Sequence, residues 1–273
     1  MNFIYDRNEY VASTWTLEHM PLYEALTAFD QYGFKNVEIW SDTVHLDPRN
    51  AMDIAEVRVW IKKFGMNVHS LHAPFRNYNV RPADDGAFCR MRTENIKKTV
   101  DYAQELDCGI LVVHAIDRHE YNYPMSQLSI VQDYIGEITL YAAKRSVQIA
   151  IEDIPPGDGP DEIYTSLENQ KRLFENLGIK FCLDIGHVPL LGADMFREID
   201  AAGSDLITLH VHNNSGKTDD HNLPTDGTLD WPRIHDYIRK NGYKGEFVLE
   251  IYGGADKESE FAVLDRMSAL FEA

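Results

Sequence analysis

The chain has 273 residues, of which 44% are apolar, which suffices for a large core and is too many for a disordered chain. Its 26 basic residues stand against 44 acidic ones, so the formal net charge is −18. This balance argues against nucleic-acid partners, which usually select a basic footprint, and against anionic membranes. A small-molecule substrate is the simpler interpretation.

Cysteine usage and the N-terminal segment indicate the compartment. Cys89, Cys108 and Cys182 are an odd number of thiols without zinc-finger spacing, which favours a reducing, cytoplasmic setting. The polar N-terminus is not typical of a signal peptide, and no apolar run approaches the roughly 18 residues of a membrane span. Nothing in the sequence marks an oligomer interface, so a homo-oligomer stays an open alternative.

The chain alternates short β-branched runs with longer amphipathic segments. Strands are predicted at residues 10–15, 36–40, 66–72, 109–114, 147–152, 180–184, 205–212 and 246–251. Helices are predicted at residues 18–32, 51–64, 86–107, 126–145, 165–177, 191–202, 231–241 and 256–271. Each predicted strand is thus followed by one predicted helix.

This alternation predicts an α/β fold with a parallel sheet. Glycines that stop helices separate several helical segments from the next strand: Gly33, Gly65, Gly109, Gly178 and Gly242. Eight strand–helix repeats favour a closed (β/α)8 TIM barrel, for which about 250 residues is typical, over an open sheet. No Gly-x-Gly-x-x-Gly follows the first strand, which weakens a dinucleotide-binding alternative. We therefore expect one barrel domain over residues 1–273.

Acid–base and metal-binding residue types gather at the ends of the predicted strands. Side chains alternate between the two faces of a strand, so every second residue should point into the barrel. From the third strand onward, the last inward residues are His72, His114, Glu152, Asp184, His210 and Glu250. Because barrel active sites form at the C-terminal strand ends, these side chains predict a shared site.

Three more residues of the same types follow in the adjoining loops, namely His187, Asp219 and His221. Together the nine residues supply five imidazoles and four carboxylates. This donor set suits zinc, manganese or a similar divalent ion, and buried carboxylates without partners would be unfavourable. The sequence therefore predicts at least one divalent-metal site at the barrel mouth.

These residues lie in motifs that resemble the xylose-isomerase-like TIM-barrel superfamily, from about Val11 to Phe271. The motifs are His72-Ala-Pro-Phe, Val-Val-His114, Ile-Glu152, Cys-Leu-Asp184-Ile-Gly-His187, Leu-His210-Val-His-Asn, Asp219-Asp-His221 and Leu-Glu250. The superfamily holds sugar isomerases, sugar-phosphate epimerases, inosose-processing enzymes and endonuclease IV.

Two functions follow from this resemblance. Members with one metal ion match this chain at Glu152, Asp184, His210 and Glu250, and in the epimerases the two glutamates move a proton through a metal-bound enediolate. The resemblance thus implies an isomerase or epimerase that acts on a sugar, sugar phosphate or polyol, with Glu152 and Glu250 as the acid–base pair.

Endonuclease IV-like members bind three zinc ions through further ligands, and this chain matches those ligands at His72, His114, His187, Asp219 and His221. The resemblance thus leaves a zinc phosphodiester hydrolase as the alternative, although no basic rim surrounds the predicted mouth aromatic Phe75 beyond Arg76 and Arg81. A dehydratase or lyase of the same superfamily, or a barrel that binds without catalysis, also stays open.

Five further residues are predicted to contact a substrate: Glu38, Trp40, Phe75, His212 and Lys217. Glu38 and Trp40 end the second strand, and Phe75 follows the third. His212 shares the inward parity of His210. By the same parity His69 should point outward, and Asp230 should cap the helix that begins at Trp231.

Overall fold

Eight parallel strands form a closed barrel in this computed structural model, with the neighbour order β1-β2-β3-β4-β5-β6-β7-β8 and β8 back to β1. The structure describes residues 5–50, 52–75, 85–116, 128–156 and 164–272. The strands are β1 (Tyr10–Ser13), β2 (Asn36–Trp40), β3 (Asn67–His72), β4 (Ile110–His114), β5 (Gln148–Glu152), β6 (Lys180–Asp184), β7 (Leu206–Val211) and β8 (Phe247–Leu249). The predicted TIM barrel is therefore confirmed.

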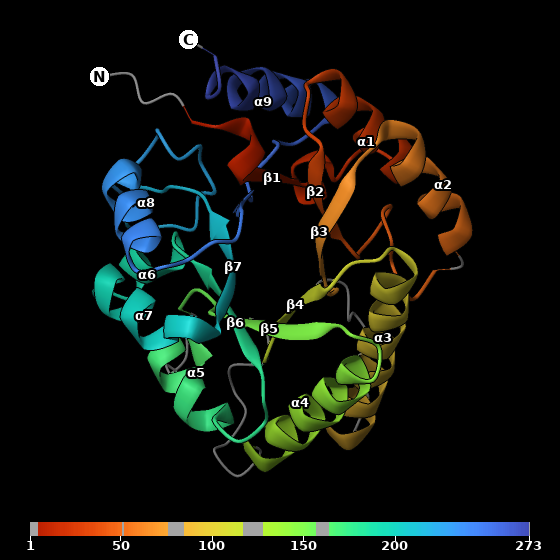
Figure 1. Ribbon diagram of the computed structural model, residues 1–273, viewed down its shortest axis with the longest axis vertical. Helices are drawn as coiled ribbons and strands as arrows, with labels where there is room; N and C mark the ends of the chain where they lie inside the picture. The colour runs from red at the N-terminus through yellow and green to blue at the C-terminus, as the bar shows by residue number, and fades with distance from the viewer. Residues whose placement is uncertain (1–4, 51, 76–84, 117–127, 157–163, 273) are drawn as a thin grey trace.

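Helices surround the barrel of strands and succeed one another around it in chain order (Figure 1). They are α1 (Leu22–Gln31), α2 (Ile54–Phe64), α3 (Asp85–Glu105), α4 (Leu128–Ala143), α5 (Leu167–Phe174), α6 (His187–Leu190), α7 (Met195–Ala202), α8 (Trp231–Lys240) and α9 (Lys257–Ala269). Among the described residues, none of them combines the length and apolar character that a bilayer crossing requires.

Local signals explain where several helices begin and end. The Asp53 side chain accepts a hydrogen bond from Ala55 N at the start of α2, and Gly65 ends that helix in the left-handed region at φ 58°. Asp230 caps α8 by accepting a hydrogen bond from Arg233 N, as predicted.

The helix predicted at residues 191–202 begins too early, because α7 starts only at Met195 and a separate short helix, α6, ends before it at Leu190. Gly192 between them adopts the left-handed region at φ 64°, which stops a helix. Asp194 then starts α7, since its side chain accepts hydrogen bonds from Phe196 N and Arg197 N. The first predicted strand is also too long, because residues 14–17 form a 3-10 helix.

The core has two parts. A large apolar cluster lies between the sheet and the helices, whereas a small one fills the barrel interior with Val112, Ala150 and Cys182, packed by Ile110 and Ile207. These small side chains close the interior below the C-terminal strand ends, as in other barrels of this type. The polar strand-end residues therefore rest on a packed floor.

A register shift between β2 and β3 changes which side chains face the barrel interior. Between β2 and β3 the pairing moves from Val37↔Val68 to Glu38↔Ser70, so His69 is an extra residue in β3. The ring of His69 lies 3.1 Å from Thr208 Oγ1 on β7, which is neither neighbour of β3, so this contact crosses the barrel. The prediction that His69 points outward is wrong, because a bulge breaks the alternation of sides.

Candidate metal centre

The predicted strand-end residues share one rim of the barrel. His72, His114, Glu152, Asp184 and His210 lie at or next to the C-terminal ends of β3 to β7, and Glu250 directly follows β8. The register places His114 beside Glu152 and Asp184 beside His210 on adjacent strands. The sheet itself therefore brings these side chains together.

Three carboxylates surround one imidazole nitrogen at the centre of the rim. His210 Nδ1 lies 3.1 Å from Glu152 Oε1, 3.3 Å from Glu250 Oε2 and 4.0 Å from Asp184 Oδ2. One donor atom from each of these four buried residues lies within 4.8 Å of all the others. We call Glu152, Asp184, His210 and Glu250 the central cluster.

The second oxygen of Glu152 belongs to another group of donors. Glu152 Oε2 lies 3.0 Å from His72 Nε2 and 3.2 Å from His114 Nε2. His72, His114 and Glu152 form what we call the side cluster, and their donor atoms also lie within 4.8 Å of one another. Glu152 thus joins two clusters, one through each carboxylate oxygen.

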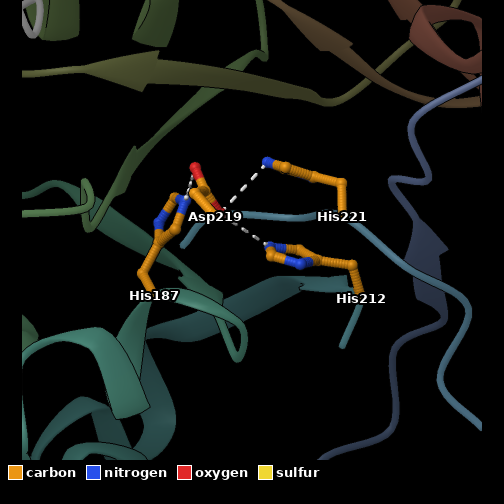
Figure 2. A group of neighbouring side chains, drawn as sticks. All are labelled: His187, His212, Asp219 and His221. Atoms are coloured by element: carbon orange, nitrogen blue, oxygen red, sulfur yellow. Dashed lines mark ion pairs between the residues drawn. The ribbon is translucent and has the colours of Figure 1, made fainter. Parts of the chain in front are cut away.

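A third group, the outer cluster, consists of His187, His212, Asp219 and His221, again with donor atoms within 4.8 Å of one another. Figure 2 shows the three imidazoles around the Asp219 carboxylate. Asp219 Oδ1 lies 3.4 Å from His221 Nε2 and 3.8 Å from His212 Nε2, and Oδ2 lies 3.5 Å from His187 Nε2. His212 Nε2 also lies 2.8 Å from Asp184 Oδ1, which joins the outer and central clusters.

Backbone carbonyls orient three of the imidazoles. The Nδ1–H groups of His72, His187 and His221 donate to Ala73 O at 2.8 Å, Asp153 O at 2.8 Å and Glu250 O at 2.9 Å. Because the carbonyl accepts, Nδ1 carries a proton, and Nε2 is the nitrogen that faces the carboxylates and is available to a cation when it is deprotonated. This is the arrangement that a histidine ligand needs.

In the central cluster, the imidazole and the carboxylates each stabilise the charged form of the other, although burial opposes it. Burial alone would lower the pKa of His210, but the carboxylates of Glu152 and Glu250 raise it well above its ordinary value. Burial would likewise raise the pKa of Glu152, yet His210 and His114 hold it well below its ordinary range. The carboxylate is therefore ionised at neutral pH and attracts either protons on its imidazole neighbours or a cation.

The outer cluster follows the same electrostatic pattern. Burial opposes the charged form of His221, but the hydrogen bond and charge of Asp219 raise the pKa of His221 to about 9. Burial also opposes ionisation of Asp219, whereas His187 holds the pKa of that carboxyl well below its ordinary range. A divalent ion would replace the protons that these imidazoles otherwise take up.

Two buried carboxylate oxygens in these clusters lack a hydrogen-bond donor within the described part of the chain. They are Asp184 Oδ2 in the central cluster and Asp219 Oδ1 in the outer cluster. Burying such an atom without a partner costs free energy, and buried charges are normally paired or coordinate metals. The residues present therefore fit divalent ions, both in donor chemistry and in spacing.

The xylose isomerase-like TIM barrel family model matches residues 26–269. The chain belongs to this family. A relative from Methanocaldococcus jannaschii, the uncharacterised protein MJ1311, is 27% identical over 83% of this chain and 79% of its own length. Fructoselysine 3-epimerase from Shigella flexneri is 22% identical over 86% of each chain.

Solved structures of similar fold include sugar epimerases. A D-tagatose 3-epimerase-like protein superposes with a TM-score of 0.78 over 97% of both chains, at 20% sequence identity. Proteins described as D-psicose 3-epimerase and as AP endonuclease, family 2, from Brucella melitensis have the same fold. Proteins of similar fold thus include both sugar epimerases and an AP endonuclease family 2 protein.

Within this family fold, the five residues predicted to contact substrate occupy different places. Phe75 is half-buried, with its ring 5.1 Å from that of His72 and 4.8 Å from that of His114. Trp40 is fully buried behind Phe75, and Lys217 is exposed in the loop after β7. His212 lies in the outer cluster, and Glu38 is fully buried against His210.

Two residues that sequence reasoning did not select also border the site. The Trp15 ring packs edge-on to His221 at 4.7 Å, from the 3-10 helix after β1. Cys182 has its thiol in a group with Glu152 and His210 within 4.8 Å. Cys182 lies two residues before Asp184 on β6, so strand parity already indicated that it points inward, whereas no sequence signal indicated the fold-back of Trp15.

Proposed function

We propose that this protein is a divalent-metal-dependent isomerase or epimerase that acts on a sugar, sugar phosphate or related polyol. The observation that carries the proposal is the central cluster, in which three ionised carboxylates converge on His210 Nδ1 at the barrel mouth. Zinc or manganese fits this mixture of oxygen and nitrogen donors.

The two glutamates of the central cluster would perform the proton transfer. An ion held by Glu152, Asp184, His210 and Glu250 would polarise the substrate carbonyl. One glutamate then removes the proton from the neighbouring carbon, and the C–H electron pair moves toward the carbonyl oxygen to give an enediolate. The other glutamate returns a proton to carbon, either on the opposite face or at the adjacent position.

Two further observations support a small sugar-like substrate. The formal charge of −18 disfavours a polyanionic partner, because the net negative charge repels phosphates at long range. Phe75 provides a half-buried aromatic ring beside the side cluster, where it would contact the apolar face of a sugar ring. The sugar epimerases among similar folds agree with this substrate class.

Substitution of the proposed acid–base pair tests the mechanism. We expect Glu152→Gln and Glu250→Gln each to reduce turnover by about 100-fold to 10,000-fold, which is the usual contribution of a positioned acid or base. The assay uses a panel of ketoses, aldoses and their phosphates in D2O, with saturating Mn²⁺ or Zn²⁺ and mass detection of deuterium in the product.

A matched control is Glu260→Gln, because Glu260 is equally buried but bonds His19 and no member of the clusters. The wild-type protein should introduce one deuterium at the reacting carbon, and the control should behave the same. Unchanged turnover in either active-site variant, with its metal content intact, would show that the glutamates do not move the proton.

A second candidate function is phosphoester hydrolysis, which the side and outer clusters favour specifically. Several ions within one mouth could hold both oxygens of a phosphodiester and activate water. Metal counting on the purified protein separates the candidates, together with cleavage of DNA that contains an abasic site. One tightly bound ion and intact DNA support the isomerase; two or three zinc ions with DNA cleavage support the hydrolase.

A further inference from the structure

His210 is oriented differently from the other anchored imidazoles of the site. His72, His187 and His221 donate through Nδ1 to backbone carbonyls and present Nε2 to the clusters. His210 instead presents Nδ1 to three carboxylates, and its Nε2 lies 3.2 Å from Glu38 Oε2. A carboxylate therefore occupies the place that a carbonyl takes at the other three histidines.

Glu38 can only accept hydrogen bonds in this position. Its side chain is 0% exposed, and both of its oxygens already accept from serine hydroxyls. Ser13 Oγ donates to Oε1 at 3.2 Å, and Ser70 Oγ donates to Oε2 at 2.7 Å. Three donors thus converge on one carboxylate, so the proton between Glu38 and His210 belongs to His210 Nε2.

The sheet places these partners on either side of Glu38. Ser13 pairs with Glu38 across β1 and β2, and Ser70 pairs with it across β2 and β3. The Ser70 pairing exists only because of the bulge at His69, since an unbroken register would set His69 opposite Glu38. The irregular strand thus gives Glu38 a hydroxyl donor on each side.

We propose that Glu38 is a positioning residue that holds His210 with its Nδ1 lone pair toward the central cluster and thereby raises the affinity of that cluster for a divalent ion. A carboxylate is a stronger acceptor than a backbone carbonyl, so it makes the imidazole a better electron donor to a cation. Glu38 contacts the Nε2 side of His210, whereas the carboxylates of the central cluster face the Nδ1 side, so Glu38 acts on the cluster through this ring. This role rests on the metal site of the proposed function, but not on the reaction.

Metal affinity of the purified protein tests the proposal without any enzyme assay. Zn²⁺ and Mn²⁺ dissociation constants are measured by competition with a chelator for the wild type, Glu38→Gln, Ser70→Ala and Glu260→Gln. Glutamine keeps the volume of Glu38 and removes its charge. Ser70→Ala removes one donor to Glu38 and leaves the carboxylate in place.

We expect Glu38→Gln to weaken one class of bound ion by about 10-fold to 100-fold, the usual effect of losing such a partner. Ser70→Ala should weaken the same ion less, and Glu260→Gln should match the wild type. Loading with Co²⁺ gives a second readout, because a reoriented His210 shifts the visible absorption bands of the bound ion, whereas a change in global stability does not.

Equal affinities and Co²⁺ spectra for Glu38→Gln and the wild type would overturn this role for Glu38. That result is distinguishable from failure of the proposed function, in which the wild type binds ions tightly but converts no sugar. Circular dichroism of the metal-free variants checks folding. If Glu38→Gln fails to fold, Ser70→Ala still tests the support that Glu38 gives to His210, because it removes a hydrogen bond to the Glu38 carboxylate.

Discussion

At the scale of single residues, the site depends on which ring nitrogen each histidine presents. Four imidazoles of the rim are anchored through one nitrogen, and the other nitrogen faces a carboxylate. The carboxylates are buried and ionised, because neighbouring imidazoles hold their pKa values low. Fixed imidazole orientation and clustered carboxylates together prepare the mouth for cations, which would replace the protons on the imidazoles.

His45 gives a pH-dependent term of stability outside the site. It is almost fully buried, its Nε2–H donates to Met20 O at 3.0 Å, and burial lowers its pKa to about 4. The unfolded chain, with a pKa near 6.5, takes up a proton first as the pH falls. His45 therefore contributes stability above pH 6.5 that is lost between pH 6.5 and 4, in total on the order of 3 kcal/mol.

His45→Gln removes this term, because glutamine keeps a donor and does not titrate. Urea unfolding at several pH values, with a chelator present, measures the free energy of unfolding of both proteins. We expect the wild type to lose about 1.4 kcal/mol more per pH unit than the variant within that window. Parallel curves would contradict the assignment of this loss to His45.

The alternation of sides along each strand predicted which strand-end residues share the rim, but it did not predict the direction of every side chain. The nine metal-ligand candidates could be selected because acid–base types recur at successive strand ends, and a barrel brings those ends together. Parity failed at His69, where a bulge inserts a residue, since nothing in the local sequence reports the register of a neighbouring strand. The contact between Glu38 and His210 could not be predicted either, because it joins β2 to β7 across the barrel and these strands are not neighbours.

At the scale of elements, the turn between β6 and α6 shapes the outer cluster. Gly186 precedes His187, and a Cβ on this glycine would lie 1.9 Å from Cε1 of His212. The Asn214 side chain also donates to Gly186 O at 2.7 Å, which fixes the turn against the loop after β7. Only glycine therefore lets His212 reach Asp184 and Asp219.

Gly186→Ala should displace the His212 ring and weaken zinc binding at the outer cluster by at least about tenfold. The overlap should also lower the free energy of unfolding by about 1–3 kcal/mol. Metal titration and urea unfolding measure the two effects. The control is Gly136→Ala in α4, where the new Cβ meets only Leu177 Cδ2 at an ordinary 3.5 Å.

If the Gly186 variant retained all its zinc sites with wild-type affinity, the close packing of His212 would have no bearing on metal binding.

Helix boundaries near this turn could not be predicted from the periodicity of apolar residues. The apolar pattern suggested a helix from residue 191, but the left-handed Gly192 and the Asp194 cap delay the start of α7 to Met195. Single residues at the helix ends therefore set this boundary, and the average apolar pattern did not.

At the scale of the whole molecule, barrel closure is what turns a sequence pattern into a site. Residues as distant in the chain as Glu38 and His210 meet because β8 pairs with β1 and all strands end at one rim. The whole chain carries a formal charge of −18, so at long range it attracts cations and repels polyanions. Fold class and charge were predictable from the sequence, because both are sums over many residues.

The most direct test of metal binding is anomalous diffraction from crystals of the protein saturated with Zn²⁺ or Mn²⁺, recorded on both sides of the metal edge. We predict an anomalous peak within coordination distance of Glu152, Asp184, His210 and Glu250 together. A map from saturated crystals without a peak among these four side chains would contradict the central claim.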